Sequence, residues 1–326
     1  MTYELIIIGA GPAGISMACE AIASGIESEK IIILEKSEAH SWSIRKFYPD
    51  KKLVTANYKG KDAMCSGVMC INDSSKQETL SYLDQKISDN KLKVNYKETV
   101  WKIEKKENTF EIETSSGNYV GKVCAIAIGM MGKPNKPDYR IPAEIRECFS
   151  HDISSKPIEG DHVLVVGGGD SASEYAQYLS QEGKEVSFSY RKSELSRMND
   201  INRDSLLALG ERGKVDLLLE SEVEEVKAAE KGVEVIFKDS RFEPLTVNHV
   251  VLALGGTTPK NFLSVLGIEF NEGEPVIKEG YETSVPGLFL IGDLSAGKKG
   301  GSIISAFNSS HEAMQKICTD YLNCRL

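Results

Sequence analysis

Short apolar runs, glycine turns and helical patterns alternate along this chain in an order that repeats. The first apolar run covers residues 5–8, which is too short for a globular helix and has the length of a buried strand. Glycines spaced G-x-G-x-x-G follow over 9–14, and small and apolar residues then alternate at helical spacing over 13–24. A second apolar run over 30–34 ends at Glu35. This order predicts a strand–helix–strand unit that binds a dinucleotide.

Each part of this first unit has a physical role in the prediction. Gly9 permits the tight turn, Gly11 lets a pyrophosphate approach the backbone, and Gly14 lets the helix pack against the strand. The N-terminus of the helix faces the phosphates, because its first backbone N–H groups have no partner within the helix. Glu35 is placed to accept hydrogen bonds from the ribose hydroxyls.

The same pattern returns in the second half of the chain. A strand over 162–166 leads into a glycine turn over 167–172, a helix over 173–182 and a strand over 185–190. The turn has the spacing G-x-G-x-x-A, so we expect a second dinucleotide-binding unit here.

The charges around the second unit indicate which nucleotide it binds. Its last strand ends in Arg191 and Lys192 rather than in an acid, and Arg197 lies just beyond. Cations at this position suit a 2′-phosphate, which favours NADP over NAD; the alternative is a solvated basic turn. Glu174, in the first turn of the helix, can bond a nicotinamide carboxamide, and an acid there is also favoured by the helix dipole.

The segments between the two units are less regular. Residues 36–50 are expected to be an irregular segment in which Trp42 and Tyr48 either stack on a flat ring or anchor a loop. An amphipathic pattern predicts a helix over 76–90, and residues 92–120 predict a series of strands.

Further apolar runs end in glycine and predict buried strands. These runs cover 123–129, 250–255 and 286–293, the last of which ends in Gly-Asp. A connection that contains proline and lysine over 133–142 is expected to be a hinge or a domain boundary, and a final helix is expected over 303–322.

Composition and charge exclude several classes of protein. At 326 residues the chain is long enough for two domains, each with its own core. A net charge of −9 without a basic block argues against a nucleic-acid partner, and we expect no signal peptide, no membrane-spanning run and no metal site. Seven cysteines without regular spacing fit a reducing cytoplasm, and we expect Cys65 and Cys70 to be ordinary buried thiols.

These features together resemble the low-molecular-weight thioredoxin reductases, which are flavoproteins with two dinucleotide-binding domains. The resemblance covers nearly the whole chain. It implies an α/β fold of two Rossmann-like, three-layer domains, with the NADPH-binding domain inserted in the FAD-binding domain. It assigns residues 1–130 and 255–326 to the FAD-binding domain and 131–254 to the NADPH-binding domain. It also implies a homodimer formed through the FAD-binding domains.

The same resemblance implies roles for individual residues. Asp293 bonds the ribityl chain of FAD, and the helix that begins near Ser302 and Ile303 directs its N-terminus at the flavin edge that becomes negative on reduction. The residues expected to bind FAD are Gly9, Gly11, Pro12, Ala13, Gly14, Glu35, Lys36, Trp42, Tyr48, Gly129, Gly292, Asp293, Ser302 and Ile303. Those expected to bind NADPH are Gly167, Gly169, Asp170, Ser171, Ala172, Glu174, Arg191, Lys192 and Arg197.

One departure from this family bears on function. Thioredoxin reductases carry a Cys-x-x-Cys pair ahead of the second glycine motif, whereas the matching stretch here contains only Cys148. The chain is more similar to the NADPH:flavodoxin (quinone) reductases and the thioredoxin-reductase-like ferredoxin–NADP reductases, in which a tyrosine at the position of Tyr48 stacks on the flavin. The stretches that carry this resemblance are 34–41, 46–48, 127–137, 167–176 and 190–197.

We therefore expect an FAD enzyme that passes electrons from NADPH to flavodoxin, ferredoxin or a quinone, with no acid–base triad. Lysines near Tyr48 are expected to form a rim that steers an acidic carrier toward the flavin, and the alternative is a solvated loop. These lysines are Lys46, Lys51, Lys52, Lys59 and Lys61.

Three other functions are compatible with parts of the pattern. The first is a flavin monooxygenase-like enzyme, for which the chain is short. The second is a disulfide reductase for a low-molecular-weight thiol, which is disfavoured because the first glycine loop has Ala13 rather than a cysteine. The third is an FAD-binding sensor, which the intact second nucleotide site disfavours.

Overall fold

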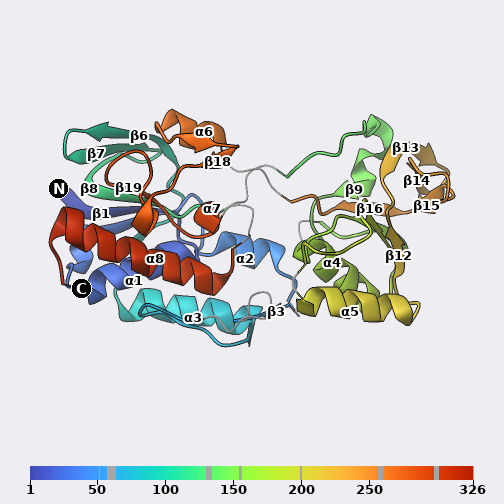
Figure 1. The fold of residues 1–326 in the computed structure, drawn as a ribbon, viewed down its shortest axis with the longest axis horizontal. Coiled ribbons are helices and arrows are strands. Elements are labelled where there is room, and N and C mark those ends of the chain that lie inside the picture. Colours follow the sequence, from blue (N-terminus) through green and yellow to red (C-terminus); the bar gives the residue numbers. More distant parts are fainter. Residues whose placement is uncertain are drawn as a thin grey trace.

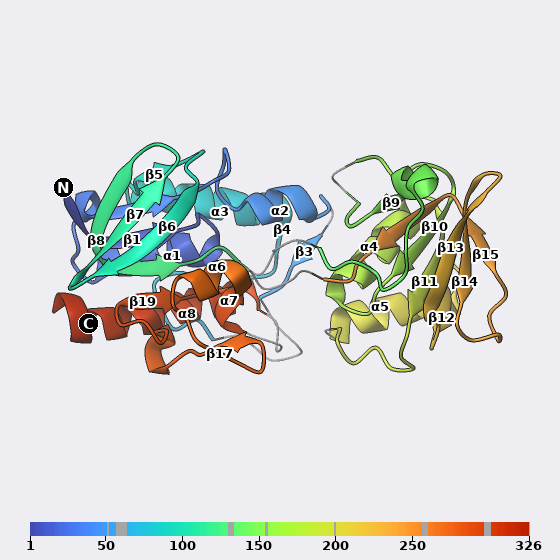
Figure 2. The same cartoon turned by 90° about the horizontal axis from the view of Figure 1, so that it is seen from above.

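The computed structural model describes residues 1–50, 52–56, 64–129, 134–153, 156–198, 200–255, 260–296 and 301–325. These residues form two lobes that lie side by side along the long axis of the molecule (Figures 1 and 2). Both ends of the chain lie in the same lobe, which we call the first lobe.

The first lobe is formed by the two ends of the chain and contains a large sheet flanked by helices. Its strands are β1 (Thr2–Ile8), β2 (Ile31–Leu34), β3 (Leu53–Val54), β4 (Ser74–Ser75), β5 (Val94–Asn95), β6 (Val100–Lys106), β7 (Thr109–Thr114), β8 (Asn118–Ile126), β17 (Phe270–Asn271), β18 (Glu274–Pro275) and β19 (Leu288–Leu290). Its helices are α1 (Pro12–Ala23), α2 (Trp42–Phe47), α3 (Lys76–Asp89), α6 (Lys260–Val265), α7 (Asp293–Ala296) and α8 (Ile303–Ile317). Short helical turns are η1 (Ser28–Lys30), η3 (Glu279–Tyr281) and η5 (Cys318–Leu322).

The main sheet of this lobe has the strand order β5-β2-β1-β8-β7-β6, and β19 pairs with β8. β1 runs parallel to β2 and β8, and β8 runs parallel to β19, whereas β6, β7 and β8 form an antiparallel meander. The strand β2 is buried along its whole length, as expected for a parallel strand that is covered on both faces.

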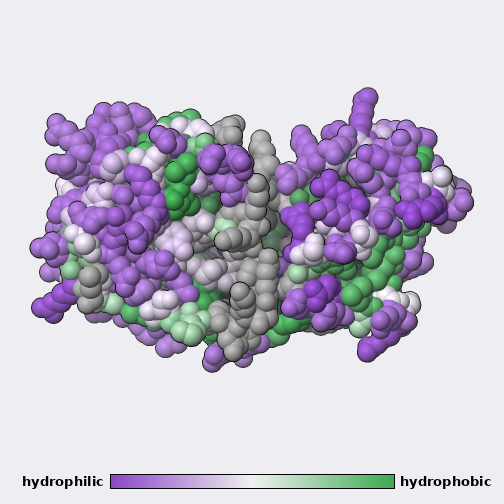
Figure 3. All heavy atoms as spheres, in the orientation of Figure 1, coloured by the Kyte–Doolittle hydropathy of each residue, from purple (hydrophilic) through white to green (hydrophobic). Residues whose placement is uncertain are grey.

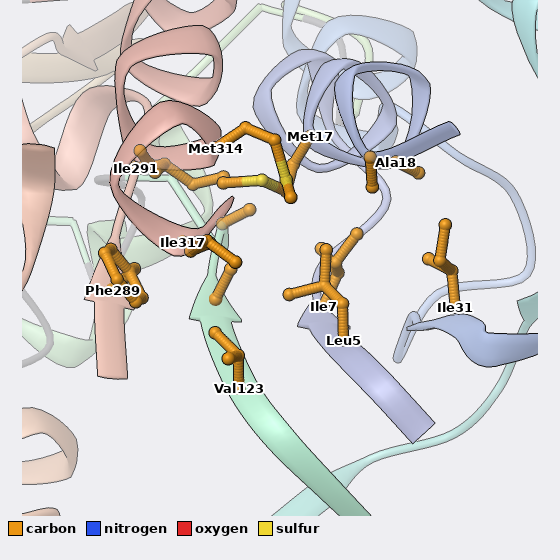
Figure 4. Packing of buried hydrophobic residues seen from close by; sticks show 14 of the residues in the cluster. Leu5, Ile7, Met17, Ala18, Ile31, Val123, Phe289, Ile291, Met314 and Ile317 are labelled. Carbon is orange, nitrogen blue, oxygen red and sulfur yellow. The ribbon is translucent and has the colours of Figure 1, made fainter. Parts of the chain in front are cut away.

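One face of this sheet packs against α1 and α8. Met17 of α1 and Met314 of α8 meet above Leu5 and Val123, which come from β1 and β8 (Figure 4). A second apolar cluster covers the opposite face of the sheet and includes Phe110. The two clusters make this lobe a three-layer unit.

The second lobe is formed by the middle of the chain, after β8 and before α6. Its strands are β9 (Phe149–Ser150), β10 (His162–Val166), β11 (Glu185–Tyr190), β12 (Asp216–Leu219), β13 (Val223–Ala229), β14 (Gly232–Phe237), β15 (Leu245–Val247) and β16 (His249–Leu252). Its helices are η2 (Ala143–Cys148), α4 (Asp170–Gln181) and α5 (Asp200–Glu211).

A parallel sheet with the order β12-β11-β10-β16-β9 forms the centre of the second lobe. Residues of β10 alternate between its two faces. Val163 and Val165 join a cluster with α4 and α5, whereas Leu164 joins a cluster with the small antiparallel sheet β13-β14-β15. The second lobe therefore also has three layers, and the expected fold class of two Rossmann-like units is confirmed.

The observed elements differ from the sequence expectations in a few places. The segment expected to be irregular contains a short helix, α2, which follows a left-handed Ser41 and contacts α3. The helix of the second unit begins at Asp170, three residues earlier than expected. The last helix ends at Ile317 and continues as a π-helical turn to Leu322. The domain boundaries at 130/131 and 254/255 remain a prediction.

The cysteines differ more seriously from expectation. Cys65 and Cys70 form a disulfide with a Cα–Cα distance of 5.6 Å, and Cys318 and Cys324 form another with a Cα–Cα distance of 4.7 Å. The expectation that Cys65 and Cys70 are ordinary buried thiols is wrong, because tertiary contacts fold the loop between them until their side chains meet.

Hydrophilic residues cover most of the face seen in Figure 3, and the apolar patches on it are small and separate. Among the described residues, no helix is both long and apolar enough to cross a membrane.

Candidate functional site

The turn between β1 and α1 has the geometry of an anion-binding loop. Gly9 has a φ of +104°, which a residue with a side chain rarely adopts. A Cβ on Gly14 would lie 2.0 Å from the carbonyl oxygen of Gly9, so the third glycine is needed for the helix to meet the turn. Gly11 caps α1, and Pro12 occupies its first turn. The unpaired N–H groups at the start of α1 therefore lie at the end of β1, where a phosphate can bind.

Glu35 lies at the end of β2 beside this turn. Its Oε2 accepts a hydrogen bond from the backbone N–H of Ala10, and its Oε1 accepts one from the N–H of Ser37, both at 2.8 Å. The carboxylate thus joins the loops that follow β1 and β2. An ionised carboxylate has about four acceptor positions, so Glu35 can still accept a bond from a hydroxyl.

Asp293 follows β19 and also lines the site. Gly292 adopts a φ of +72° and donates its backbone N–H to Ser309 Oγ at 2.9 Å, which holds the turn against α8. Within the described part of the chain, the Asp293 carboxylate has no hydrogen bond or ion pair. Its side chain is open to the cavity described below, yet surrounding protein atoms desolvate it and raise its pKa. An unpaired carboxylate beside a cavity is suited to accept bonds from a polyol chain.

Helix α8 begins beside Asp293. Ser302 caps it, because its Oγ accepts a bond from the N–H of Ser305 while Ser305 Oγ accepts one from the N–H of Ser302. A Cβ on Gly301 would lie 2.0 Å from Asp293 Oδ1, so only glycine allows the start of the helix to approach this carboxylate. The positive end of the α8 dipole thus lies next to Asp293.

All of these groups face one cavity of about 780 Å³, which is within the range of ligand sites. Every residue expected to bind FAD lines this cavity except Gly14, which is instead packed inside the turn. Residues that the sequence analysis missed also line it, and they include Thr99, Val100 and Phe262. They come from elements far apart in the sequence and carry no motif, so no local signal could have identified them.

The second glycine turn follows the same plan as the first. A Cβ on Gly167 would lie 2.4 Å from the carbonyl oxygen of Ala253, and Gly169 caps α4. Asp170 and Ser171 at the start of α4 line the cavity, whereas Gly167 and Gly169 do not. Ala172, also expected at this site, is fully buried in the core of the second lobe. The structure therefore directs the N-termini of α1 and α4 toward the same space.

The three cations expected to bind a 2′-phosphate lie away from this cavity. Arg191, Lys192 and Arg197 are exposed in the segment after β11. In the described part of the chain none of them forms an ion pair, so their charges are available to a ligand. Arg203 of α5 lies across a shallow pocket from residues 193–196 and was missed because α5 is separate in sequence.

Lys52 and Glu174 connect the two lobes across the cavity. Lys52 Nζ lies 2.7 Å from Glu174 Oε2, and each side chain is 17% exposed. The same ammonium group lies 3.8 Å from the centre of the Tyr48 ring. Glu174 Oε1 also accepts a bond from Asn202 Nδ2 at 3.2 Å. Burial alone would lower the pKa of Lys52, but Tyr48 and Glu174 outweigh it and the pKa is raised.

This geometry corrects the expected lysine rim. Lys52 does not lie on an exposed rim, because Glu174 and the Tyr48 ring draw its side chain into the space between the lobes. Lys46 lies beside Trp42, with Nζ 5.1 Å from the ring centre. Lys51, Lys59 and Lys61 lie outside the described residues.

Comparison with known proteins identifies the family. Residues 6–292 match the model of the pyridine nucleotide-disulphide oxidoreductases, and the chain belongs to this family. A ferredoxin–NADP reductase from Ignicoccus hospitalis is 30% identical over 304 residues, with 91% of each chain covered. The bacilliredoxin reductase Bdr from Bacillus subtilis is 29% identical over 326 residues, which cover 96% of this chain and 97% of that protein. The solved bacillithiol disulfide reductase Bdr from Bacillus cereus has a TM-score of 0.81 at 22% identity, with 98% and 99% of the two chains covered.

The chain is thus an NAD(P)H-dependent flavoprotein oxidoreductase, and its cofactors are FAD and NADPH. The residues present fit these groups. The glycine turn leaves room for a phosphate, Glu35 and Asp293 provide acceptors in the cavity wall, and α8 provides a positive dipole end beside Asp293. Among the described residues there is no cluster of three or more metal-ligating side chains.

Proposed function

We propose that this enzyme passes electrons from NADPH to a small electron carrier of the ferredoxin or flavodoxin type, or to a quinone, without a thiol relay. The main support for this proposal is the set of residues that line the cavity. Residues expected to bind FAD and the N-terminus of α4 line one cavity, and no cysteine is found among its described lining residues. A thiol relay through this space would need a sulfur there.

Bound FAD supplies the two-electron chemistry, and the side chains of this enzyme bind and orient the cofactors. Gly9 and Gly11 leave the backbone open to the pyrophosphate, and Glu35 accepts bonds from the ribose. Asp293 accepts bonds from the ribityl chain, and the N-terminus of α8 stabilises negative charge on the flavin ring. Tyr48 and Trp42 line the cavity as candidates for stacking on that ring.

The second lobe binds NADPH in this proposal. The N-terminus of α4 holds the pyrophosphate, and Arg191, Lys192 and Arg197 contact the 2′-phosphate. Glu174 accepts a hydrogen bond from the nicotinamide carboxamide. We further propose that the boundaries of the inserted lobe lie near 130/131 and 254/255, that the enzyme is cytoplasmic, and that it forms a homodimer through the first lobe.

The name of the relative from Ignicoccus hospitalis supports ferredoxin as the acceptor. Flavodoxins and ferredoxins are typically acidic, so cations such as Lys46 near Tyr48 would favour their approach even though the net charge of this chain is −9. A second candidate is the reduction of a disulfide substrate, which the relative named bacilliredoxin reductase favours.

The two candidates are separated by one experiment. The purified enzyme is reduced anaerobically with NADPH and is then offered flavodoxin, ferredoxin, a water-soluble quinone, oxidised thioredoxin, a low-molecular-weight disulfide and oxygen in turn. Reoxidation of the flavin is followed by absorbance. Fast reoxidation by a carrier that persists in a Cys65→Ser/Cys70→Ser variant supports the proposal. Reoxidation only by disulfides, abolished in that variant, would overturn it.

A further inference from the structure

We infer that the Cys65–Cys70 disulfide is a thiol–disulfide exchange site for external dithiols, and that its redox state controls how firmly residues 64–71 dock on α8. This site goes beyond the proposed function, because none of its residues lines the cofactor cavity.

The two disulfides of this chain differ in their access to solvent. Cys70 is exposed and Cys65 is half-buried, on a loop at the surface of the first lobe. In the other pair, Cys318 is only 1% exposed and belongs to the apolar cluster beneath α8, and Cys324 is half-buried against the same cluster. Exchange requires an incoming thiolate to reach a sulfur, so the accessible pair reacts first.

The geometry also indicates which sulfur is attacked. Cys70 is the exposed residue of the pair, whereas Cys65 is half-buried and packs against the apolar cluster around Ile44 and Phe307. The thiolate forms a mixed disulfide with Cys70, and Cys65 leaves as a thiolate and takes a proton from solvent. The second thiol of the external dithiol then attacks the mixed disulfide. The dithiol is oxidised to its own disulfide, and Cys65 and Cys70 are left as two thiols.

The loop between the two cysteines is docked on α1 and α8 by specific contacts. Ser66 donates its backbone N–H to Asn308 Oδ1 at 2.9 Å, and Asn308 Nδ2 donates to the carbonyl oxygen of Met64 at 2.8 Å. Val68 donates its N–H to Glu20 Oε1 at 2.6 Å. The loop is therefore attached to both helices through its backbone on either side of Gly67.

Glu20 and Gly67 make this docking possible. Glu20 is a buried carboxylate whose Oε2 lies 2.9 Å from His311 Nδ1, so it joins α1, α8 and the loop. A Cβ on Gly67 would lie 1.9 Å from Glu20 Oε1, so any other residue would push the loop away from this carboxylate. The contacts require a narrow loop conformation, which the disulfide restrains by closing a short ring.

The docked loop lies against the start of the helix that borders the cofactor site. Cys65 packs against the cluster that contains Ile304 and Phe307, which are in the first turns of α8. Ser302 and Ile303, immediately before them, line the FAD cavity. Opening the disulfide removes this restraint on the loop, and we expect it to loosen the packing of the loop against the end of α8 that borders the cofactor site.

The first test measures which disulfide opens. The full-length enzyme is equilibrated anaerobically in mixtures of reduced and oxidised dithiothreitol, free thiols are blocked with N-ethylmaleimide, and the modified cysteines are identified by mass spectrometry. We expect Cys65 and Cys70 to open at a ratio of reduced to oxidised reagent about tenfold lower than that needed for Cys318 and Cys324. Joint opening, earlier opening of Cys318–Cys324, or free thiols at Cys65 and Cys70 without reductant would overturn the inference.

The second test separates the roles of the two sulfurs. With oxidised glutathione as the probe, Cys65→Ser retains the exposed thiol and is expected to form a mixed disulfide about fivefold faster than Cys70→Ser. Equal rates, or faster reaction of Cys70→Ser, would contradict the assignment of Cys70 as the attacked residue.

The third test concerns the link to α8. The Kd for FAD is measured by flavin fluorescence for the wild type, Cys65→Ser/Cys70→Ser and the control Cys318→Ser/Cys324→Ser. We expect the first variant to raise the Kd about threefold to tenfold, and the control to change it by less than about twofold. An unchanged Kd in the first variant would overturn the coupling. None of these measurements depends on the electron acceptor, so the proposed function can fail without affecting them.

Discussion

Lys52 and Glu174 are 122 residues apart in the sequence and form an ion pair of 2.7 Å that joins the two lobes across the cofactor cavity. The pair is mostly shielded from water, so it is stronger than an exposed one. It also occupies the carboxylate that we propose for the nicotinamide carboxamide. Lys52 therefore competes with NADPH for this carboxylate, and we expect binding of the nucleotide in that manner to weaken the ion pair.

Lys52→Met is therefore expected to lower the KM for NADPH. The substitution removes a partner that competes for Glu174, so a larger fraction of the enzyme is able to bind NADPH. If the lost interaction is worth about 1 kcal/mol, the affinity for NADPH rises about fivefold. Steady-state kinetics and NADPH titration of the oxidised enzyme check this. Lys238→Met is the control, because it breaks an ion pair of the same length, 2.7 Å, with Glu222 inside the second lobe. A KM that rises in Lys52→Met and is unchanged in Lys238→Met would contradict the competition.

Asp293→Asn is expected to have opposite effects on stability and on cofactor binding. Burial raises the pKa of Asp293, so the charged form is less favourable in the folded apoprotein than in the unfolded chain. This penalty is absent below the ordinary pKa of 3.8 and develops as the pH rises through the folded value. At pH 7 the apoprotein of the variant should therefore melt at a higher temperature than the wild type, with the difference vanishing near pH 3.

The same substitution should weaken the binding of FAD, because it removes a charge-assisted hydrogen bond worth about 1.5–3 kcal/mol, or roughly 10- to 100-fold in Kd. Thermal melts of the apoprotein and fluorescence titration with FAD measure the two effects separately. Asp320→Asn, on the outer side of the first lobe, is the control. A variant that binds FAD as tightly as the wild type would argue against Asp293 as a ligand.

Substitutions at two glycines of the first turn are expected to have different effects, one on the binding of FAD and the other on the stability of the apoprotein. Gly11 has a φ of −80°, and a Cβ there would have only ordinary contact with the protein, at 3.8 Å from the carbonyl oxygen of Ala127. Gly11→Ala should leave the melting temperature of the apoprotein nearly unchanged and weaken FAD binding about tenfold or more, because the methyl group occupies the approach of the pyrophosphate. Gly14→Ala should destabilise the apoprotein itself, because its Cβ would lie 2.0 Å from the Gly9 oxygen. Equal melting temperatures of the two apoprotein variants would contradict this difference between Gly11 and Gly14.

The preference for NADPH is expected to be shared among exposed cations. Arg191→Ala and Lys192→Ala should each lower kcat/KM for NADPH by about two- to fivefold, since interactions of exposed charges are individually weak, and both should leave kcat/KM for NADH unchanged. Arg197→Ala should have a smaller effect, because Arg197 lies several residues beyond the end of β11. The effects should decrease at high salt. Equal use of NADH and NADPH by the wild type would remove the basis for this prediction.

Local patterns were sufficient to predict the two glycine turns and the strands and helices on either side of them. The apolar run and glycine spacing at the start of the chain predicted β1, the turn and α1, because a short strand and a tight turn depend mainly on the residues within them. The strand, glycine turn and helix of the second unit could be predicted for the same reason. The placement of Asp293 and of the helix that begins at Ile303 at the flavin came from the resemblance to the thioredoxin reductases and not from a local pattern.

Contacts between distant segments were decided only by the tertiary structure. Nothing near Lys52 in the sequence indicates that it faces Glu174 rather than solvent, because the pair exists only when the two lobes are placed together. The Cys65–Cys70 disulfide was missed for a related reason. Its loop is held by Glu20 and Asn308, which lie 48 residues before Val68 and 242 residues after Ser66. Glycine conformation and apolar periodicity act locally and can be read from neighbouring residues, whereas the partner of a charge or a thiol depends on how the whole chain folds.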